Sequence, residues 1–293
     1  MGYNCGDNEE WIRSNRIVGG SDVRWGEVPW QVRLRIQLDN AVMQCGAVLI
    51  DTDWVLTAAH CVTYCPNLCS DITAYFGEHR LINEYKQSKA VQILLNNKER
   101  SKPYDSLFET NHYNEIIARK AAKVMVNNRF NEKTFEGDIA LIKVNQSVRF
   151  SDNIQPICLP KVMENFAGET GFISGFGVLK SGSKQVPHNL QISSVSIFTT
   201  TFCEYMLREL GYDDVVKWGK LCAGAIDGGR DACAGDSGGP LTVRRSEDNK
   251  WVLVGIISNG IKCGQPNTPG LYTQVSAFVN WINAVIANET MHS

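Results

Sequence analysis

Short apolar stretches separated by turn residues recur along most of the chain. Residues 30–38, WQVRLRIQL, alternate apolar and polar positions, which is typical of a half-buried strand. Six further runs are apolar or β-branched and too short for most helices: CGAVLI, WVLTAA, DIALIKV, ETGFISGFG, PLTVRR and WVLVGIIS. This pattern favours a β-sandwich or barrel over alternating strands and helices.

Two segments have the spacing of amphipathic helices, and a third has no regular pattern. FCEYMLREL, residues 202–210, and VSAFVNWINAVIAN near the C-terminus carry apolar residues on one helical face, and we expect the second helix at 276–288. Residues 84–113 mix KAVQILL with a polar stretch. They are too long for an ordinary hairpin loop, and their role is open.

Composition and charge exclude several classes of protein. The 293 residues carry a formal net charge of -2 with both signs scattered, so no nucleic-acid partner is expected. No run of about 18 apolar residues occurs, so we expect neither a transmembrane helix nor a membrane partner. Residues 1–15 are polar and acidic and lack the apolar centre of a signal peptide. If the protein is secreted, its targeting segment is not in this sequence.

Ten cysteines indicate disulfides and an oxidising compartment. A zinc site is the weaker interpretation, because Cys65 and Cys69 supply two ligands and no nearby Cys or His pair completes a tetrahedral set. Two glycosylation sequons, at Asn145 and Asn288, fit a secreted glycoprotein.

Three short motifs carry candidate chemistry: TAAHC with His60, EGDIALIKV with Asp138, and GRDACAGDSGGPL with Ser237. Each alone also fits a structural role, as a buried histidine, a turn cap or a glycine-rich turn. Together they are typical of nucleophilic catalysis. An imidazole can take the proton of a serine hydroxyl, and a buried carboxylate can hold that imidazole in the right tautomer. Glycines such as Gly235 let the backbone present N–H groups to an oxyanion.

The sequence resembles the chymotrypsin/trypsin family of serine endopeptidases from residue 16 to about residue 286. The resemblance is carried by RIVGG, PWQV, LTAAHC, DIALI, PICLP, GDSGGPL and TPGLYTQV, in the order of the family. The order His, Asp, Ser also matches this family and differs from that of the α/β-hydrolases. The resemblance implies an all-β fold of two six-stranded antiparallel β-barrels packed face to face, with a C-terminal α-helix.

The resemblance assigns catalytic roles to individual positions. His60 would be the general base, Asp138 would orient it, and Ser237 would attack the scissile carbonyl. The backbone N–H groups of Gly235 and Ser237 would form the oxyanion hole, and Ser258 would support the carboxylate and the substrate backbone.

Primary specificity is expected at Asp231, six residues before the nucleophile, where trypsin-like members place an acid. A poorly solvated carboxylate favours a cationic partner, which predicts cleavage after Arg or Lys. Gly260 and Gly270 would leave the pocket open. Ala232 replaces a hydroxyl residue of trypsin, which favours Arg over Lys.

The chain departs from the family pattern at three places. Asn259 stands where most members have Trp, so we expect a weak preference for bulky apolar residues N-terminal to the cut. Lys262 replaces a usual Gly at the pocket rim, and it either contacts substrate or is simply solvated. A calcium site is left open at Glu78 and Glu84, where the register of the family's calcium loop is broken; no other metal or cofactor is expected.

The resemblance also implies a pairing for every cysteine and a mode of activation. The expected disulfides are Cys5–Cys158, Cys45–Cys61, Cys65–Cys69, Cys203–Cys222 and Cys233–Cys263. Cleavage of the Arg16–Ile17 bond would free an α-amino group that pairs with Asp236, and Cys5 would keep the leader attached.

We therefore expect residues 1–16 to be a leader and residues 17–293 to form the peptidase domain, with barrels at about 17–145 and 146–275. The expected protein is a secreted, extracellular precursor of a selective endopeptidase in a proteolytic cascade. Its expected partners are a protein substrate, an upstream trypsin-like activating protease and serine protease inhibitors. A digestive trypsin and a non-catalytic homologue that acts as a binding or regulatory protein are the alternatives.

Overall fold

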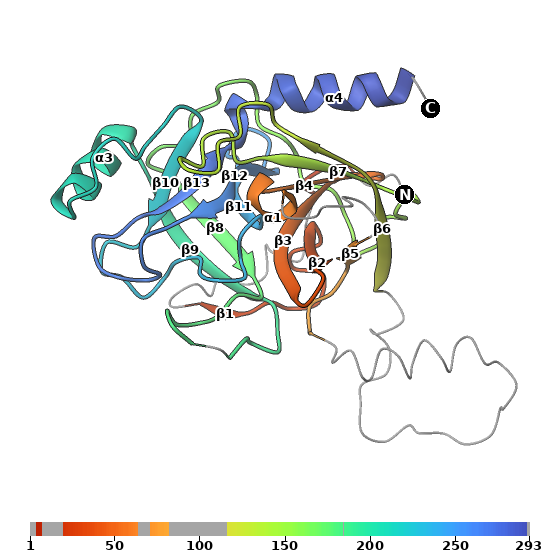
Figure 1. The fold of residues 1–293 in the computed structure, drawn as a ribbon, viewed down its shortest axis with the longest axis horizontal. Helices are drawn as coiled ribbons and strands as arrows, with labels where there is room; N and C mark the ends of the chain where they lie inside the picture. Colours follow the sequence, from red (N-terminus) through yellow and green to blue (C-terminus); the bar gives the residue numbers. More distant parts are fainter. Residues whose placement is uncertain (1–3, 8–19, 64–70, 82–115, 184, 292–293) are drawn as a thin grey trace, which may run out of the picture.

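Two closed antiparallel β-barrels dominate the computed structural model, which describes residues 4–7, 20–63, 71–81, 116–183 and 185–291 (Figure 1). The first barrel has the neighbour order β2-β3-β4-β7-β6-β5. Its strands are β2 (Gln31–Gln37), β3 (Val42–Asp51), β4 (Trp54–Thr57), β5 (Ile72–Phe76), β6 (Ile117–Val126) and β7 (Ala140–Val144).

The second barrel has the order β9-β10-β13-β12-β11-β8, and the pairing of β8 with β9 closes it. Its strands are β8 (Thr170–Gly175), β9 (Gln191–Phe198), β10 (Lys220–Gly224), β11 (Pro240–Arg244), β12 (Trp251–Asn259) and β13 (Gly270–Gln274). A short strand near the start of the chain, β1 (Ser21–Asp22), pairs with β9. The expected architecture of two six-stranded barrels is confirmed.

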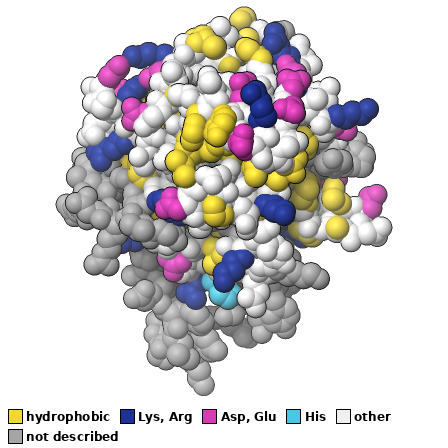
Figure 2. All heavy atoms as spheres, turned by 90° about the vertical axis from the view of Figure 1, so that its left-hand side faces the viewer, with side chains coloured by type: hydrophobic (Ala, Val, Ile, Leu, Met, Phe, Trp, Pro, Cys, Tyr) yellow, Lys and Arg dark blue, Asp and Glu magenta, His cyan; other side chains and the backbone are white. Residues whose placement is uncertain are grey.

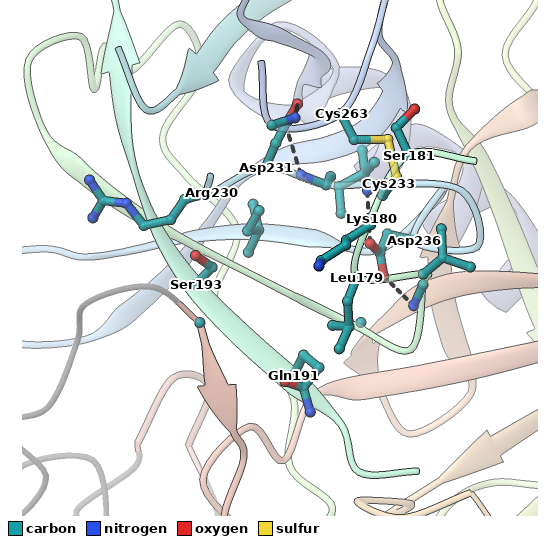
Figure 3. A pocket seen from close by; sticks show the side chains of 18 of the residues that line it. Leu179, Lys180, Ser181, Gln191, Ser193, Arg230, Asp231, Cys233, Asp236 and Cys263 are labelled. Carbon is teal, nitrogen blue, oxygen red and sulfur yellow. Dashed lines mark hydrogen bonds between the residues drawn. A yellow bond between two sulfur atoms is a disulfide. The ribbon is translucent and has the colours of Figure 1, made fainter. Parts of the chain in front are cut away.

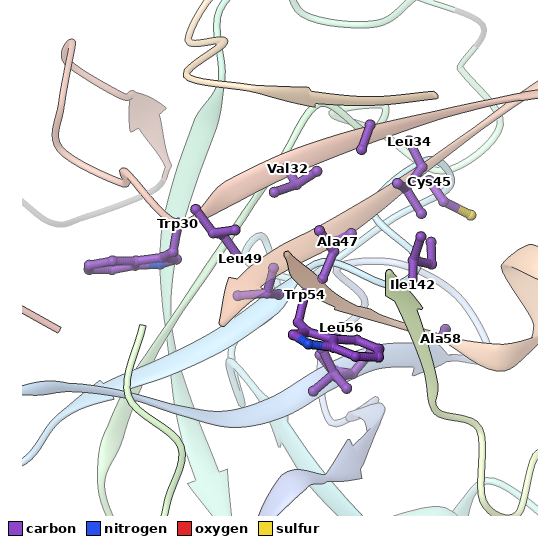
Figure 4. Close-up of a cluster of buried hydrophobic side chains, with 14 of the residues drawn as sticks. Trp30, Val32, Leu34, Cys45, Ala47, Leu49, Trp54, Leu56, Ala58 and Ile142 are labelled. Atoms are coloured by element: carbon purple, nitrogen blue, oxygen red, sulfur yellow. The ribbon is translucent and has the colours of Figure 1, made fainter. Parts of the chain in front are cut away.

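The interior of the first barrel is filled by alternate side chains of its strands. Val32 and Leu34 of β2, Ala47 and Leu49 of β3 and Leu56 of β4 are at most 1% exposed (Figure 4). Burial of one such aliphatic side chain larger than alanine stabilises the fold by about 1.5–3 kcal/mol. The barrel is therefore a rigid frame for the loops at its ends.

The strand β2 is more buried than its alternating pattern predicts. Its polar side chains Gln31 and Arg33 are 4% and 9% exposed. The Gln31 side-chain oxygen accepts a 2.7 Å hydrogen bond from the Ser174 hydroxyl of β8, and Arg33 pairs with Glu78. The polar face was expected to meet solvent, but it is covered because the second barrel and Glu78 supply polar partners for it.

The helices of the described residues lie outside the barrels. They are α1 (Ala59–Val62), α3 (Thr200–Glu209), the 3₁₀ turn η3 (Val275–Ala277) and α4 (Val279–Met291). The Thr199 side chain caps α3 by accepting a hydrogen bond from the backbone N–H of Phe202. The final helix begins and ends three residues later than the expected 276–288, because the first apolar positions of its pattern form the 3₁₀ turn.

Figure 2 looks onto the face that carries α3, where hydrophobic side chains are interspersed with charges of both signs. Phe202 and Tyr205 of this helix are 40% and 56% exposed. Among the described helices, none combines the length and the apolar character that a bilayer-crossing segment needs.

The leader is held against the second barrel by residues 4–7. Cys5 forms a disulfide with Cys158, and the backbone of Gly6 exchanges hydrogen bonds with Pro156 and Trp251. Gly6 has φ +65°, and a Cβ there would lie 2.4 Å from the Trp251 carbonyl oxygen, so only glycine fits this approach. The other disulfides in the described residues are Cys45–Cys61, Cys203–Cys222 and Cys233–Cys263, as the resemblance implied.

Candidate active site

His60 and Asp138 meet because two paired strands end at the same edge of the first barrel. β4 and β7 are antiparallel, with Thr57 opposite Ala140. His60 follows the end of β4 in α1, and Asp138 precedes the start of β7, so both leave the barrel on one side. His60 Nδ1 lies 2.8 Å from Asp138 Oδ2, and the His60 backbone N–H donates to Oδ1 at 2.9 Å.

The Asp138 carboxylate is fully buried and well supplied with donors. The Ser258 hydroxyl donates to Oδ2 at 2.5 Å. Burial acts to raise the pKa of Asp138, but the hydrogen bonds from His60 and Ser258 and the attraction to the imidazole hold it below its ordinary value. An ionised carboxylate only accepts hydrogen bonds, so Nδ1 of a neutral His60 carries the proton and Nε2 is left as the base.

Ser237 is held against the first barrel, near the residue that follows His60, since Cys61 Sγ lies 3.6 Å from the Ser237 carbonyl oxygen. It lies in the turn before β11, and its carbonyl accepts a 2.7 Å hydrogen bond from the backbone N–H of Gly46 in β3. Gly238 has φ +82°, and a Cβ there would lie 2.2 Å from Thr57 Oγ1. Only glycine allows this approach, which explains one glycine of the GDSGG motif. In the described residues no hydrogen bond joins the Ser237 hydroxyl to His60, and such contacts often tighten only with substrate.

A cavity of about 560 Å³ lies beside this turn. It is lined by the two acidic residues of the GRDACAGDSGGPL motif, Asp231 and Asp236 (Figure 3). Asp231 accepts hydrogen bonds from the backbone N–H groups of Ala232 at 2.8 Å and Gly264 at 3.1 Å. Burial raises the pKa of Asp231 to about 6, and these two hydrogen bonds only partly offset it. The carboxylate thus lines a cavity and would gain from a cation.

Asp236, like Asp231, is a buried carboxyl group whose pKa is raised. It accepts hydrogen bonds from the backbone N–H groups of Gly177 at 2.7 Å and Cys233 at 2.9 Å, and burial raises its pKa to about 6. A Cβ on Gly175 or Gly177 would lie within 2.4 Å of the carboxylate, so both glycines make room for it. No cationic side chain of the described residues forms an ion pair with Asp236.

Ala232 also lines this cavity, and the other expected pocket residues differ in where they lie. Gly270 faces Asp231, since a Cβ there would lie 2.9 Å from Asp231 Oδ1, whereas Gly260 borders open space. Lys262 is exposed. Ser258 and Asn259, at the end of β12, contact the Asp138 side of the site instead. The site residues expected from the sequence thus lie in two places. One is the cavity with the two acids, and the other is a buried cluster of polar side chains behind His60.

Lys220 belongs to this polar cluster, and the sequence did not identify it as a site residue. The first residue of β10, it is 4% exposed, and its ammonium donates to Ser258 Oγ at 2.7 Å and Asn259 Oδ1 at 3.1 Å. Nothing in KWGKLCAG distinguishes this lysine from an exposed one. Only the antiparallel pairing of β10 with β13 and of β13 with β12 brings it near the Asp138 carboxylate.

Of the two residues named for a possible calcium site, Glu84 lies outside the described residues and Glu78 is paired with Arg33, so that site stays a prediction. Both oxygens of Glu78 accept hydrogen bonds from the guanidinium of Arg33, at 2.6 and 3.1 Å, and the pair is buried. The positive charge beside this carboxylate is therefore already supplied by the protein.

Several expectations fall on residues outside the described part of the chain: Arg16, Ile17, Cys65, Cys69, Glu84 and the segment 84–113. The sequon residues Asn145, after β7, and Asn288, in α4, are both exposed.

Comparison with known proteins gives one consistent result. A family model described as Trypsin matches residues 17–107 and 107–282. Serine proteinase stubble of Drosophila melanogaster is 35% identical over 270 residues, which cover 91% of this chain and 30% of that protein. Transmembrane protease serine 7 of Rattus norvegicus is 34% identical, with 93% and 28% covered, and Testisin of Homo sapiens is 32% identical, with 96% and 81% covered. The chain therefore spans about a third or less of two of these relatives.

Proposed function

Because the chain belongs to the trypsin family of serine proteases, we propose that it is an endopeptidase precursor in which His60, Asp138 and Ser237 form the catalytic triad. Nε2 of His60 takes the Ser237 proton as the hydroxyl oxygen attacks the peptide carbonyl, and it later returns the proton to the leaving amine. Asp138 holds the tautomer and stabilises the imidazolium. The N–H groups of Gly235 and Ser237 stabilise the oxyanion.

The observation that carries this proposal is the pair of hydrogen bonds that fixes His60 on Asp138, at 2.8 and 2.9 Å. A histidine that only filled space would not need a fully buried carboxylate with a second donor, Ser258, behind it. Loss of the nucleophile in a triad costs on the order of 10⁶ in kcat.

The test is hydrolysis of a fluorogenic Arg-amide substrate before and after cleavage at Arg16. The activating protease is removed with an immobilised inhibitor, and a Ser237→Ala chain treated in parallel is the control. Activity that appears on cleavage and is absent from Ser237→Ala supports an enzyme. Equal rates in the two chains would favour the non-catalytic alternative.

Activation by cleavage of Arg16–Ile17 is supported by the surroundings of Asp236. Its carboxylate is buried without a cation from the described residues, and such a charge is costly. Gly20 lines the same cavity, and three residues can span about 10 Å, which gives a freed Ile17 ammonium the reach to enter it. An Arg16→Gln chain treated with trypsin should stay nearly inactive.

Asp231 supports cleavage after Arg or Lys, because a substrate cation would offset the burial that raises its pKa. Ala232 adds no side-chain acceptor beside it, so Arg should be preferred over Lys. Matched substrates that differ only in this residue test the preference, and Ala232→Ser should narrow it. Equal turnover of both substrates by the unaltered protein would refute it.

A restricted role in a proteolytic cascade, with a protein substrate, an upstream activating protease and inhibitors as partners, remains our proposal, as does location outside the cell. The exposed sequons Asn145 and Asn288 are consistent with secretion. Since the relatives include a protein named as a transmembrane protease, the similarity does not support the expected absence of a membrane partner.

A further inference from the structure

Lys220 is a buried cation for which neither the proposed mechanism nor the proposed specificity has a use. Removing a charged side chain from water is expensive, so a buried ammonium needs compensating contacts. Its hydrogen-bond acceptors in the structure are Ser258 Oγ and Asn259 Oδ1, and the ring of Phe135 lies 5.9 Å from its nitrogen. All three neighbours border the Asp138 side of the site.

The contacts fix the direction of the Ser258 hydroxyl. A hydroxyl has one proton, and an ammonium has no lone pair, so Ser258 Oγ accepts from Lys220 and must donate elsewhere. Two acceptors lie in reach: Asp138 Oδ2 at 2.5 Å and Asn259 Oδ1 at 3.2 Å. The Asp138 oxygen is both the closer acceptor and the negatively charged one, so the hydroxyl proton is directed to Asp138.

The same contacts place a positive charge about two hydrogen bonds behind the triad carboxylate. Asp138 is the charged group whose field acts on Lys220, while β12 and β13 present the uncharged Ser258, Asn259 and Thr273. Burial lowers the pKa of Lys220 to about 8, and the charge of Asp138 opposes that shift. At neutral pH the side chain is therefore mostly the ammonium form.

We propose that Lys220 is a positioning residue for the triad, which orients the Ser258 hydroxyl toward Asp138 and holds a cation behind the carboxylate that His60 contacts. This rests on the proposed function for its effect on rate. The cation partly cancels the negative field of Asp138 at His60, so the imidazolium is less favoured and the base stays available at lower pH. The directed hydroxyl keeps the carboxylate in place during the proton transfer.

The experiment compares Lys220→Met with Lys220→Gln in the cleaved full chain. Methionine fills the space without a donor or charge, and glutamine keeps a donor without the charge. Lys217→Met is the matched control, because Lys217 lies three residues away and pairs with Asp214 outside the site. In Lys220→Met we expect kcat/KM to fall on the order of tenfold. The midpoint of its acidic limb should rise by about 0.5–1 pH unit. Lys220→Gln should show the same shift of the acidic limb, with a smaller loss of kcat/KM. Lys217→Met should change neither quantity.

A second readout does not need turnover. The proton between His60 Nδ1 and Asp138 gives a low-field NMR signal, which should move to lower field in both Lys220 variants and stay in place in Lys217→Met. If the unaltered cleaved chain proves inactive, the proposed function fails while this signal still tests Lys220.

Lys220→Met should also melt at the same temperature as the unaltered chain or higher, because it removes a buried charge. An unchanged acidic limb together with an unchanged His60 signal would overturn the proposal. A lower melting temperature without either change would assign Lys220 a structural role only and overturn it as well.

Discussion

The buried carboxylate of Asp236 should contribute to the stability of the uncleaved chain with a pH dependence opposite in sign to that of most acids. Its pKa is raised from 3.8 to about 6 in the folded chain, because burial outweighs the two N–H donors. The folded state therefore holds this proton more tightly than the unfolded state. The stability that this carboxyl contributes should be greatest below about pH 4 and should be lost as the pH rises through 6.

The size of the effect follows from the shift. About two pKa units correspond to roughly 3 kcal/mol of unfolding free energy at neutral pH. An ion pair with the Ile17 ammonium would offset much of this loss of unfolding free energy. Cleavage after Arg16 should therefore stabilise the chain by a few kcal/mol at pH 7 and by little at pH 4.

The assay is urea unfolding of Ser237→Ala, which prevents self-digestion, at pH values from 4 to 7.5 before and after cleavage. Asp236→Asn is the control, because it keeps the size of the side chain and cannot ionise. The pKa of Asp231 is also raised to about 6, so Asp231 adds a similar pH dependence to the chains with and without Asp236→Asn. Its effect cancels when their unfolding free energies are subtracted. The same pH slope in Asp236→Asn, or equal stability before and after cleavage at pH 7, would refute the reasoning.

Three further predictions concern single side chains. Asp231→Asn should lower kcat/KM for an Arg substrate by about 2–5 kcal/mol, which is roughly 30-fold to 5,000-fold, with little change in the rate of active-site labelling; an unaltered Arg preference would remove Asp231 from the specificity pocket. Arg33→Leu should lower the free energy of unfolding by about 3–5 kcal/mol, since it leaves the Glu78 carboxylate buried without its partner. Denaturant titration measures this loss, and the same titration of the unaltered chain with and without added calcium tests whether calcium binds. Gly238→Ala should prevent accumulation of correctly folded chain or abolish activity, because its Cβ would overlap Thr57 Oγ1; normal activity would show that the turn can move away from β4.

The strands and the candidate triad residues could be predicted because their signals are local, whereas the two-barrel arrangement was implied by the family resemblance, since short apolar runs fit a sandwich as well as a barrel. Short apolar runs with turns between them predict strands, and each triad residue lies inside its own motif. The one helix that was misplaced, expected at 276–288, shows the limit of such signals: the pattern marks an apolar face but not where a 3₁₀ turn changes to the α-helix α4 (Val279–Met291).

What could not be predicted depends on contacts between distant segments. Lys220 reads as an ordinary polar residue until β10 is paired with β13. Asp231 and Asp236 were assigned separate roles, yet they line one cavity, which the Cys233–Cys263 disulfide also borders. The burial of Arg33 likewise depends on Glu78, 45 residues away.

The central claim is that Ser237 becomes a reactive nucleophile in this chain. The most direct measurement is labelling with a fluorophosphonate, followed by mass spectrometry of the peptides, in chains cleaved and not cleaved after Arg16. We predict one label per cleaved chain, located on Ser237, and much slower labelling of the uncleaved chain and of His60→Ala. A cleaved chain without a label on Ser237 would contradict the account.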